Sequence, residues 1–276
     1  MKQLLNNFCV FILSFQRPQL TTLKMLKKYG YSGDYRIVLS TDDKCIDEYK
    51  KVVPQEKILV FDKQEICKDK GYIDTMNGNG NFNPNGSIYA RAFICKTAKQ
   101  MNIPYFCMAD DDIVSLYHHE VIEGKKKSKT AKTIDEVFAA FIEFLNGNER
   151  LTTINPAFCL YGGADGRFGQ QASRLMFQFF IYKTKNIRKF VGLRSEDFNH
   201  CFLNFDNIYF TYYHLTFSSP EMGANDGGIN YKEGVPSTFY MLVTHPTGVQ
   251  MLPNNKKRIL QNRIFPKIVS EDYKKK

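Results

Sequence analysis

Blocks of apolar residues alternate with amphipathic segments along the chain, and this pattern predicts strands and helices in turn. The apolar run 9–15 predicts a buried first strand, and Leu20, Leu23 and Leu26 recur at helical spacing before Gly30. Further strands are expected at 35–41, 57–62 and 103–109, and further helices at 46–53 and 88–102. Strands that alternate with helices indicate an α/β fold with a largely parallel sheet.

The second half of the chain is less regular. A helix is predicted over 133–147, and a Gly-rich loop separates two apolar segments within 152–184. A helix-like run follows Ser195, and a strand-like run precedes His245. Two loops are rich in Gly and Asn, at 77–87 and 218–234. We expect the first to order around a ligand, and the second to be either a lid or a surface hairpin.

Composition indicates an ordinary globular protein. The chain has 276 residues, enough to bury a sizeable core as one domain. It is 43% hydrophobic and 24% charged, which is ordinary for a globular protein. Seven cysteines form no C-x-x-C pair and are expected to be buried free thiols in a reducing compartment. The apolar N-terminus is interrupted by Asn6 and Asn7, so we interpret it as a strand rather than a signal peptide. No run approaches the ~20 apolar residues of a membrane span, so we expect a soluble cytoplasmic protein without membrane contact.

Three consecutive carboxylates follow the predicted strand at 103–109, namely Asp110, Asp111 and Asp112. Carboxylates at the end of a buried strand repel one another and resist desolvation, so a fold that gathers them there is expected to use them for a divalent cation. Asp110 and Asp112 flank one residue, which is the Asp-x-Asp pattern of nucleotide-sugar glycosyltransferases. The alternative interpretation is a solvated acidic turn.

Polar residues follow each of the first strands and should lie on one rim, because ligands of open α/β sheets bind at the carboxyl ends of strands. These residues are Ser14, Arg17, Asp42, Asp62 and Asp110. Their carboxylates can accept hydrogen bonds from a ribose or a base, and an Arg can pair with a diphosphate. Asp42 and Asp43 could instead cap a helix. Arg91 is expected to face the phosphates, with an exposed helical Arg as the alternative. No P-loop or G-x-G-x-x-G follows the first strand, which argues against NTPases and dehydrogenases.

Several segments together resemble the TET-associated glycosyltransferases, at 11–51, 58–66, 88–112 and 266–276. These are GT-A-type enzymes, encoded largely by bacteriophages and thought to glycosylate hydroxymethylated pyrimidines in DNA. The resemblance implies a GT-A-like α/β domain over 1–276, with a mostly parallel central sheet flanked by helices. It further implies a nucleotide-sugar-binding half at 1–119 and an acceptor-binding half at 120–276.

The resemblance also implies a set of site residues. Asp110 and Asp112 would hold Mn²⁺ or Mg²⁺ on the diphosphate of a donor, most simply a UDP-sugar, with Asp111 in the donor site. A late histidine often completes such a site; His245 is the first candidate and His214 the second, although a histidine at a strand end is often structural.

The acidic element Ser195-Glu196-Asp197 resembles the motif that GT-A enzymes place beside the acceptor. If the reaction inverts the anomeric centre, Asp197, or else Glu196, would be the general base that takes the acceptor proton. A capping box with Ser195 as N-cap is the alternative interpretation.

The chain carries 38 Lys and Arg against 28 Asp and Glu, a formal net charge of +10. Basic residues gather at 125–129, 183–189, 256–258 and 274–276. Together with the resemblance, this charge favours a polyanionic acceptor, DNA. Two other interpretations stay open: a glycan, lipid-linked sugar or protein acceptor, or a nucleic-acid-binding or sugar-nucleotide-sensing module without turnover. The sequence specifies neither the sugar nor the oligomeric state.

Overall fold

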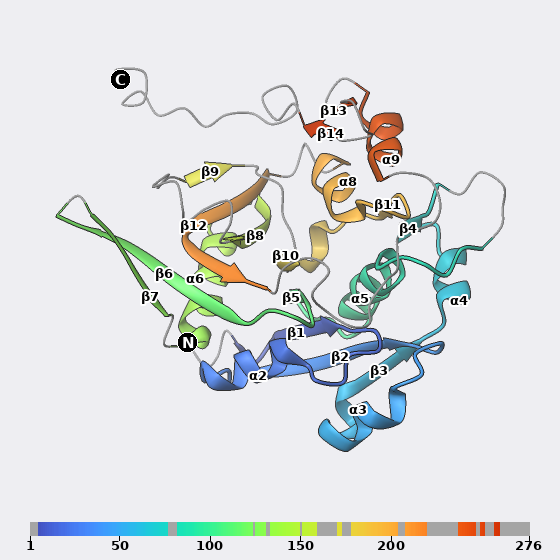
Figure 1. The fold of residues 1–276 in the computed structure, drawn as a ribbon, viewed down its shortest axis with the longest axis horizontal. Helices are drawn as coiled ribbons and strands as arrows, with labels where there is room; N and C mark the ends of the chain where they lie inside the picture. Colours follow the sequence, from blue (N-terminus) through green and yellow to red (C-terminus); the bar gives the residue numbers. More distant parts are fainter. Residues whose placement is uncertain are drawn as a thin grey trace.

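The structure is a computed structural model. It describes residues 5–76, 82–123, 125–130, 133–149, 151–158, 170–172, 178–203, 208–219, 237–246, 249–251 and 257–259. Helices lie on both faces of a large sheet, and a long two-stranded hairpin projects from one side (Figure 1). The closing segment 266–276 and most of the predicted loop 218–234 lie outside the described residues.

The main sheet has ten strands in the order β3-β2-β1-β5-β10-β8-β12-β6-β7, and β9 pairs with β12. The strands are β1 (Phe8–Leu13), β2 (Asp34–Ser40), β3 (Ile58–Phe61), β4 (Ile73–Asp74), β5 (Tyr105–Asp110), β6 (Ser115–Ile122), β7 (Lys125–Thr130), β8 (Leu151–Phe158), β9 (Gln170–Ala172), β10 (Phe179–Lys183), β11 (Phe190–Val191), β12 (Ile208–Ser218), β13 (Val249–Met251) and β14 (Lys257–Ile259). The helices are α2 (Thr21–Lys28), α3 (Ile46–Val52), α4 (Lys63–Lys68), α5 (Ile88–Gln100), α6 (Ile134–Asn146), α8 (Glu196–Leu203) and α9 (Ser237–Thr244), with short 3-10 helices η1 (Gln55–Lys57) and η2 (Thr184–Asn186).

The strands β3, β2, β1 and β5 are all parallel. β1 is apolar throughout and almost fully buried, as expected of a central parallel strand that is covered on both faces. The predicted α/β fold with a mostly parallel central sheet flanked by helices is confirmed. β10 then pairs antiparallel with both β5 and β8, and so joins the parallel half to the remaining strands.

Two hydrophobic cores fill the two faces of the sheet, because alternate residues of each strand point to opposite sides. Val10 and Ile12 of β1 pack with residues of α2, α3 and α6, whereas Cys9 and Phe11 pack with residues of α4, α5 and α9. Among the described residues, the predicted buried free thiols include Cys9, Cys95 and Cys107, and no disulfide involves them. The sheet is therefore a rigid platform whose strand ends carry the polar residues.

One local prediction was wrong. The run 239–244 belongs to helix α9 rather than to a strand: Met241 is buried while Phe239 and Val243 are exposed, which is the one-sided burial of a helix. A short apolar run does not distinguish a buried strand from a helix by periodicity alone. His118 and His119 lie in strand β6, where they point to opposite faces.

Candidate active site

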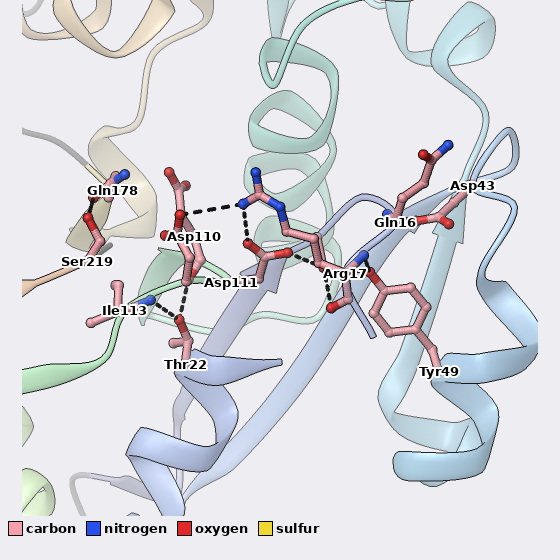
Figure 2. Close-up of polar contacts among 12 residues, drawn as sticks. Gln16, Arg17, Thr22, Asp43, Tyr49, Asp110, Asp111, Ile113, Gln178 and Ser219 are labelled. Atoms are coloured by element: carbon pink, nitrogen blue, oxygen red, sulfur yellow. Dashed lines mark hydrogen bonds and ion pairs between the residues drawn. The ribbon is translucent and has the colours of Figure 1, made fainter. Parts of the chain in front are cut away.

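The acidic cluster lies where β1 and β5 end side by side. Asp110 is the last residue of β5 and pairs in register with Leu13, the last residue of β1. The hydroxyl of Thr22 fixes the turn that follows, since it donates to the Asp110 carbonyl (2.5 Å) and accepts from the Ile113 backbone N–H (2.9 Å; Figure 2). The turn is therefore held against the start of α2, and its carboxylates face the segment that follows β1.

Arg17 pairs with two of these carboxylates. Its Nη1 lies 3.1 Å from Asp111 Oδ1 and 3.4 Å from Asp112 Oδ2 (Figure 2). Ser14 Oγ donates to Asp111 as well and lies 2.6 Å from the Tyr49 hydroxyl, which accepts from the Arg17 backbone N–H at 2.8 Å. Of the residues predicted to share one rim, the structure thus brings Ser14 and Arg17 together, against Asp111 and Asp112.

Arg91 connects the cluster to the second half of the chain. Its Nη2 lies 3.2 Å from Asp110 Oδ1 and its Nε 3.0 Å from Glu196 Oε1. The Ser87 hydroxyl also donates to Glu196, and the guanidinium lies 5.3 Å from the centre of the Phe180 ring. The Arg91 side chain is only 4% exposed, so the alternative of an exposed helical Arg is wrong.

Removal of the Arg91 charge should destabilise the protein. Arg91→Leu would leave the buried Glu196 and the partly buried Asp110 without their shared cation, and we expect the free energy of unfolding to fall by about 3 kcal/mol. Urea denaturation at pH 8 measures this loss. Arg36→Leu is the matched control, since Arg36 pairs with Asp34 nearer the surface and its loss should cost about 1 kcal/mol or less. Equal losses in the two variants would show that the Arg91 network adds nothing to stability.

The cluster carries more negative than positive charge. The carboxylates Asp110, Asp111, Asp112 and Glu196 interact with one another, and Arg17 and Arg91 pair with them. Burial, together with the neighbouring carboxylates, raises the pKa of Asp110 to about 7, against the opposing effect of Arg91. Burial likewise raises the pKa of Asp111 to about 6 and raises that of Asp112. An added cation would relieve this repulsion.

The donors present fit a hard divalent cation. Carboxylate oxygens are the ligands that Mg²⁺ and Mn²⁺ prefer, and Mg²⁺ is commonly bound by one or two carboxylates together with substrate phosphates. Across the described part of the chain, no three His, Cys, Asp or Glu side chains are grouped so that they could hold a metal. The carboxylates of the Asp cluster are of the type that such a cation prefers, and further ligands would have to come from outside the cluster.

After the end of β2, Asp43 rather than Asp42 supports the site. Asp42 is 48% exposed and pairs with Lys63 at 2.9 Å. Asp43 is buried and accepts from the backbone N–H groups of Gln16 and Cys45, each at 2.8 Å (Figure 2). It thereby holds the residue that precedes Arg17. Sequence reasoning missed this role, although the adjacent acidic residues at the strand end were the available signal.

Asp62 acts as the N-cap of α4, because its Oδ1 accepts from the backbone N–H groups of Gln64 (2.6 Å) and Glu65 (3.2 Å). This cap gives the residue a structural role. A contact with the donor stays a prediction for both Asp42 and Asp62.

The histidines occupy different surroundings. His245 follows α9, its backbone N–H donates to the Met241 carbonyl at 2.9 Å, and burial lowers its pKa. Its role as a metal ligand stays a prediction, and the side chain of His214 in β12 lies outside the described residues. His119 is buried and lies 2.8 Å from the Thr216 hydroxyl, which indicates a structural role.

The two acidic residues at the start of α8 differ in accessibility. Glu196 is buried and bonded to Ser87 and Arg91, so it is held in place and has little freedom to meet a substrate. Asp197 is partly exposed, and its Oδ1 accepts from the Phe198 backbone N–H at 2.8 Å. Of the two candidates for the general base, Asp197 is thus the more accessible.

His200 fixes α8 to the sheet. Its ring stacks on Phe190 with centroids 3.9 Å apart and meets the Tyr182 ring edge-on. Burial is the main cause that lowers its pKa to about 3, and Arg91 adds to the effect. The helix that carries Glu196 and Asp197 is therefore anchored by a histidine that is neutral in the folded protein.

This histidine should make folding sensitive to mild acid. The unfolded chain takes up a proton near pH 6.5 that the folded protein does not bind, so stability is lost as the pH falls below about 6.5. We expect a loss of about 1.4 kcal/mol between pH 7.5 and 5.5 from this residue. His200→Asn should remove that part of the pH dependence in urea titrations, whereas the control His118→Asn should retain it. An unchanged pH dependence in His200→Asn would contradict the prediction.

The fold and the site together define a class of protein: an α/β protein with an acidic cluster at the carboxyl ends of its parallel strands, the edge at which such sheets bind ligands. The sequence model of the TET-Associated Glycosyltransferase family matches residues 8–217, and the chain belongs to this family. The protein is a glycosyltransferase. The matched region includes the Asp cluster, Arg91 and Asp197, but not His245.

Two crystal structures of glucosyl-3-phosphoglycerate synthase from Mycobacterium tuberculosis are similar to the chain. One contains Mn²⁺, UDP and phosphoglyceric acid, and the other Mn²⁺, UDP-glucose and glycerol 3-phosphate. Each match has a TM-score of 0.45 and covers 91% of this chain and 86% of that structure, at identities of 8% and 7%. A search of curated proteins found no match. Within the described residues, every helix is too short or too polar to cross a membrane.

Proposed function

We propose that this glycosyltransferase moves a sugar from a nucleotide sugar, most simply a UDP-sugar, to hydroxymethylated pyrimidine bases in DNA and requires Mn²⁺ or Mg²⁺. The observation that carries the proposal is the formal excess of negative charge in the partly buried cluster at the ends of β1 and β5, where four carboxyl groups lie against two arginines. The family supplies the reaction class, and this charge supplies the reason for a cation.

On the donor side, Asp110 and Asp112 would hold the cation, with His245 as a further ligand. When bound, the cation would neutralise charge on the diphosphate as it leaves. Arg17 lies against Asp111 and Asp112, and its guanidinium would meet an adjacent phosphate of the donor. Ser14 donates to Asp111, and Asp111 in turn accepts from Arg17, so these contacts hold the Arg17 side chain in position. Asp42 and Asp62 would lie farther along the same rim and contact the nucleoside.

On the acceptor side, Asp197 would take the proton from the acceptor hydroxyl. The hydroxyl oxygen would then bond to the anomeric carbon of the sugar as the bond between that carbon and the nucleoside diphosphate breaks. Glu196 would act as a positioning residue, because Arg91 and Ser87 bind its carboxylate. Arg91 contacts both Asp110 and Glu196, so it would hold the proposed donor and acceptor sides together.

The acceptor assignment rests on the net charge of +10 and on the family resemblance. A pyrimidine in duplex DNA is stacked, so the base would have to leave the stack before its hydroxymethyl group reached the site. A binding module without turnover is disfavoured, because the chain belongs to a family of glycosyltransferases.

Nucleoside mass spectrometry tests the proposal. DNA that contains hydroxymethylcytosine or hydroxymethyluracil is incubated with the protein and a panel of nucleotide sugars, with Mn²⁺, Mg²⁺ or a chelator. We expect a hexose-type mass increase on the modified pyrimidine with one donor and only when metal is present. Modification of a glycan, lipid-linked sugar or peptide, with hydroxymethylated DNA inert, would overturn the acceptor. Full activity in chelator would overturn the metal requirement.

A further inference from the structure

The hairpin of β6 and β7 extends beyond the rest of the sheet. β6 pairs with β12 only through residues Ser115 to His118. Its outer half, His119 to Ile122, pairs in the described structure with β7 alone. The hairpin, which we call the β6–β7 ribbon, projects from the left side of the molecule in Figure 1. The sheet thus ends in a two-stranded ribbon.

The β6–β7 ribbon is basic. Four of the six residues of β7 (KKKSKT) are lysines, and the paired strand β6 contributes a single acidic residue, Glu120. Lys127 and Lys129 are exposed, and Lys129 Nζ lies 3.1 Å from Glu120 Oε2. His118 shares their face, since it pairs in register with Lys129. One face of the ribbon therefore presents positive charge that a single carboxylate only partly neutralises.

The β6–β7 ribbon begins at the candidate active site. β6 starts three residues after Asp112, and the Val114 backbone N–H donates to the Ser218 carbonyl at 2.8 Å, which fixes its direction. Because a residue advances the chain by at most ~3.3 Å, His118 lies at most about 20 Å and Ile122 at most about 33 Å from Asp112. The outer end is thus within about one turn of B-DNA, ~34 Å, of the acidic cluster.

We propose that the β6–β7 ribbon binds the duplex beside the base being glycosylated, with its basic face in the major groove and its lysines on the flanking phosphates. This inference rests on the proposed function and names the part of the chain that holds the acceptor. The major groove is ~12 Å wide and admits a two-stranded ribbon. At ~3.4 Å per base pair, the contacts fall within roughly 10 base pairs to one side of the modified base.

Charge reversal on the exposed lysines tests the ribbon. Lys127→Glu with Lys129→Glu should raise the apparent KM for a long hydroxymethylated duplex about tenfold near physiological salt. In a plot of the logarithm of DNA affinity against the logarithm of salt concentration, the slope should become shallower by about 1.8, or ~0.9 for each lost phosphate contact. Hydrolysis of the donor without DNA should be unchanged. Glu120→Lys adds charge to the same face and should tighten DNA binding.

The matched control is Lys50→Glu with Lys68→Glu. These lysines pair with Asp47 and Glu65 on exposed helices α3 and α4 near the other edge of the sheet, and the change in net charge is the same. We expect this variant to keep most of the native DNA affinity. Equal weakening in the two double variants would mean that only the net charge matters, and would overturn the ribbon inference.

The dependence of KM on duplex length distinguishes DNA binding by the ribbon from DNA binding by other basic surfaces. A duplex with about 12 base pairs on each side of the modified base spans the ribbon, whereas one with about 4 does not. Shortening should raise KM for the native protein and leave the ribbon variant unaffected. If native protein modifies hydroxymethylated DNA but both proteins respond alike to length, the ribbon inference fails and the proposed function stands. If no hydroxymethylated DNA is modified with any donor, the proposed function itself fails.

Discussion

Turnover should fall at least about 100-fold when Asp110 or Asp112 is replaced by alanine, because each change removes a proposed cation ligand. The fold should persist. Burial already raises the pKa of Asp110 to about 7, which means that the folded protein disfavours the charged carboxylate, and its removal relieves repulsion within the cluster. Steady-state kinetics with saturating donor and Mn²⁺ measures the loss, and the circular dichroism spectrum checks the fold.

Thermal melting provides a second readout for these two variants. Mn²⁺ with nucleotide should raise the Tm of the native protein and should fail to do so for Asp110→Ala and Asp112→Ala. Asp47→Ala is the control, since Asp47 is 82% exposed on α3 and should keep both turnover and the Tm shift. If Asp110→Ala and Asp112→Ala both turned over as fast as the native protein, the proposal of a metal at this site would be wrong.

Asp197→Asn should lower turnover by about 100- to 10,000-fold, the usual contribution of a general base, while the donor Kd stays near the native value. The amide keeps the size of the side chain and can still accept from the Phe198 N–H, so the start of α8 should keep its structure. Single-turnover kinetics combined with titration of nucleotide sugar separates the chemical step from donor binding.

Glu196→Gln is the companion variant, and it should act mainly on stability. Glu196 accepts from Arg91 and Ser87 in a buried site, and the amide would weaken the charge pair with Arg91. A larger loss of turnover in Glu196→Gln than in Asp197→Asn would exchange the roles of the two residues. An equal loss of donor binding in Asp197→Asn would place Asp197 in the donor site instead.

The parallel half of the sheet could be predicted because its strands are continuous apolar runs bounded by polar residues. β1 and β5 carry that signal in full, and Asp110 to Asp112 stand out because they interrupt it. The course of the second half could not be predicted in the same way. β10 is as apolar as β5, yet it runs antiparallel to it, and nothing within its five residues encodes the direction of a partner.

The contacts that organise the site join residues far apart in the chain. Asp43 meets Gln16 across 27 residues, and Arg91 meets Glu196 across 105. Local patterns identified Arg91 and Glu196 separately as candidates, but periodicity describes only neighbours along the chain, so their pairing could not be seen from the sequence. The helical state of 239–244 was missed for a related reason, since burial of Met241 on one side depends on tertiary packing.

The position of Arg91 also limits how this enzyme can be recombined with its relatives. Arg91 comes from the first half of the chain, and its partner Glu196 from the second. A chimera that keeps residues 1–119 and takes 120–276 from another protein would place Arg91 beside a foreign residue. Such exchanges should yield folded proteins mainly when the incoming segment supplies a glutamate at that position, so the Arg91–Glu196 pair has to be transferred as a unit.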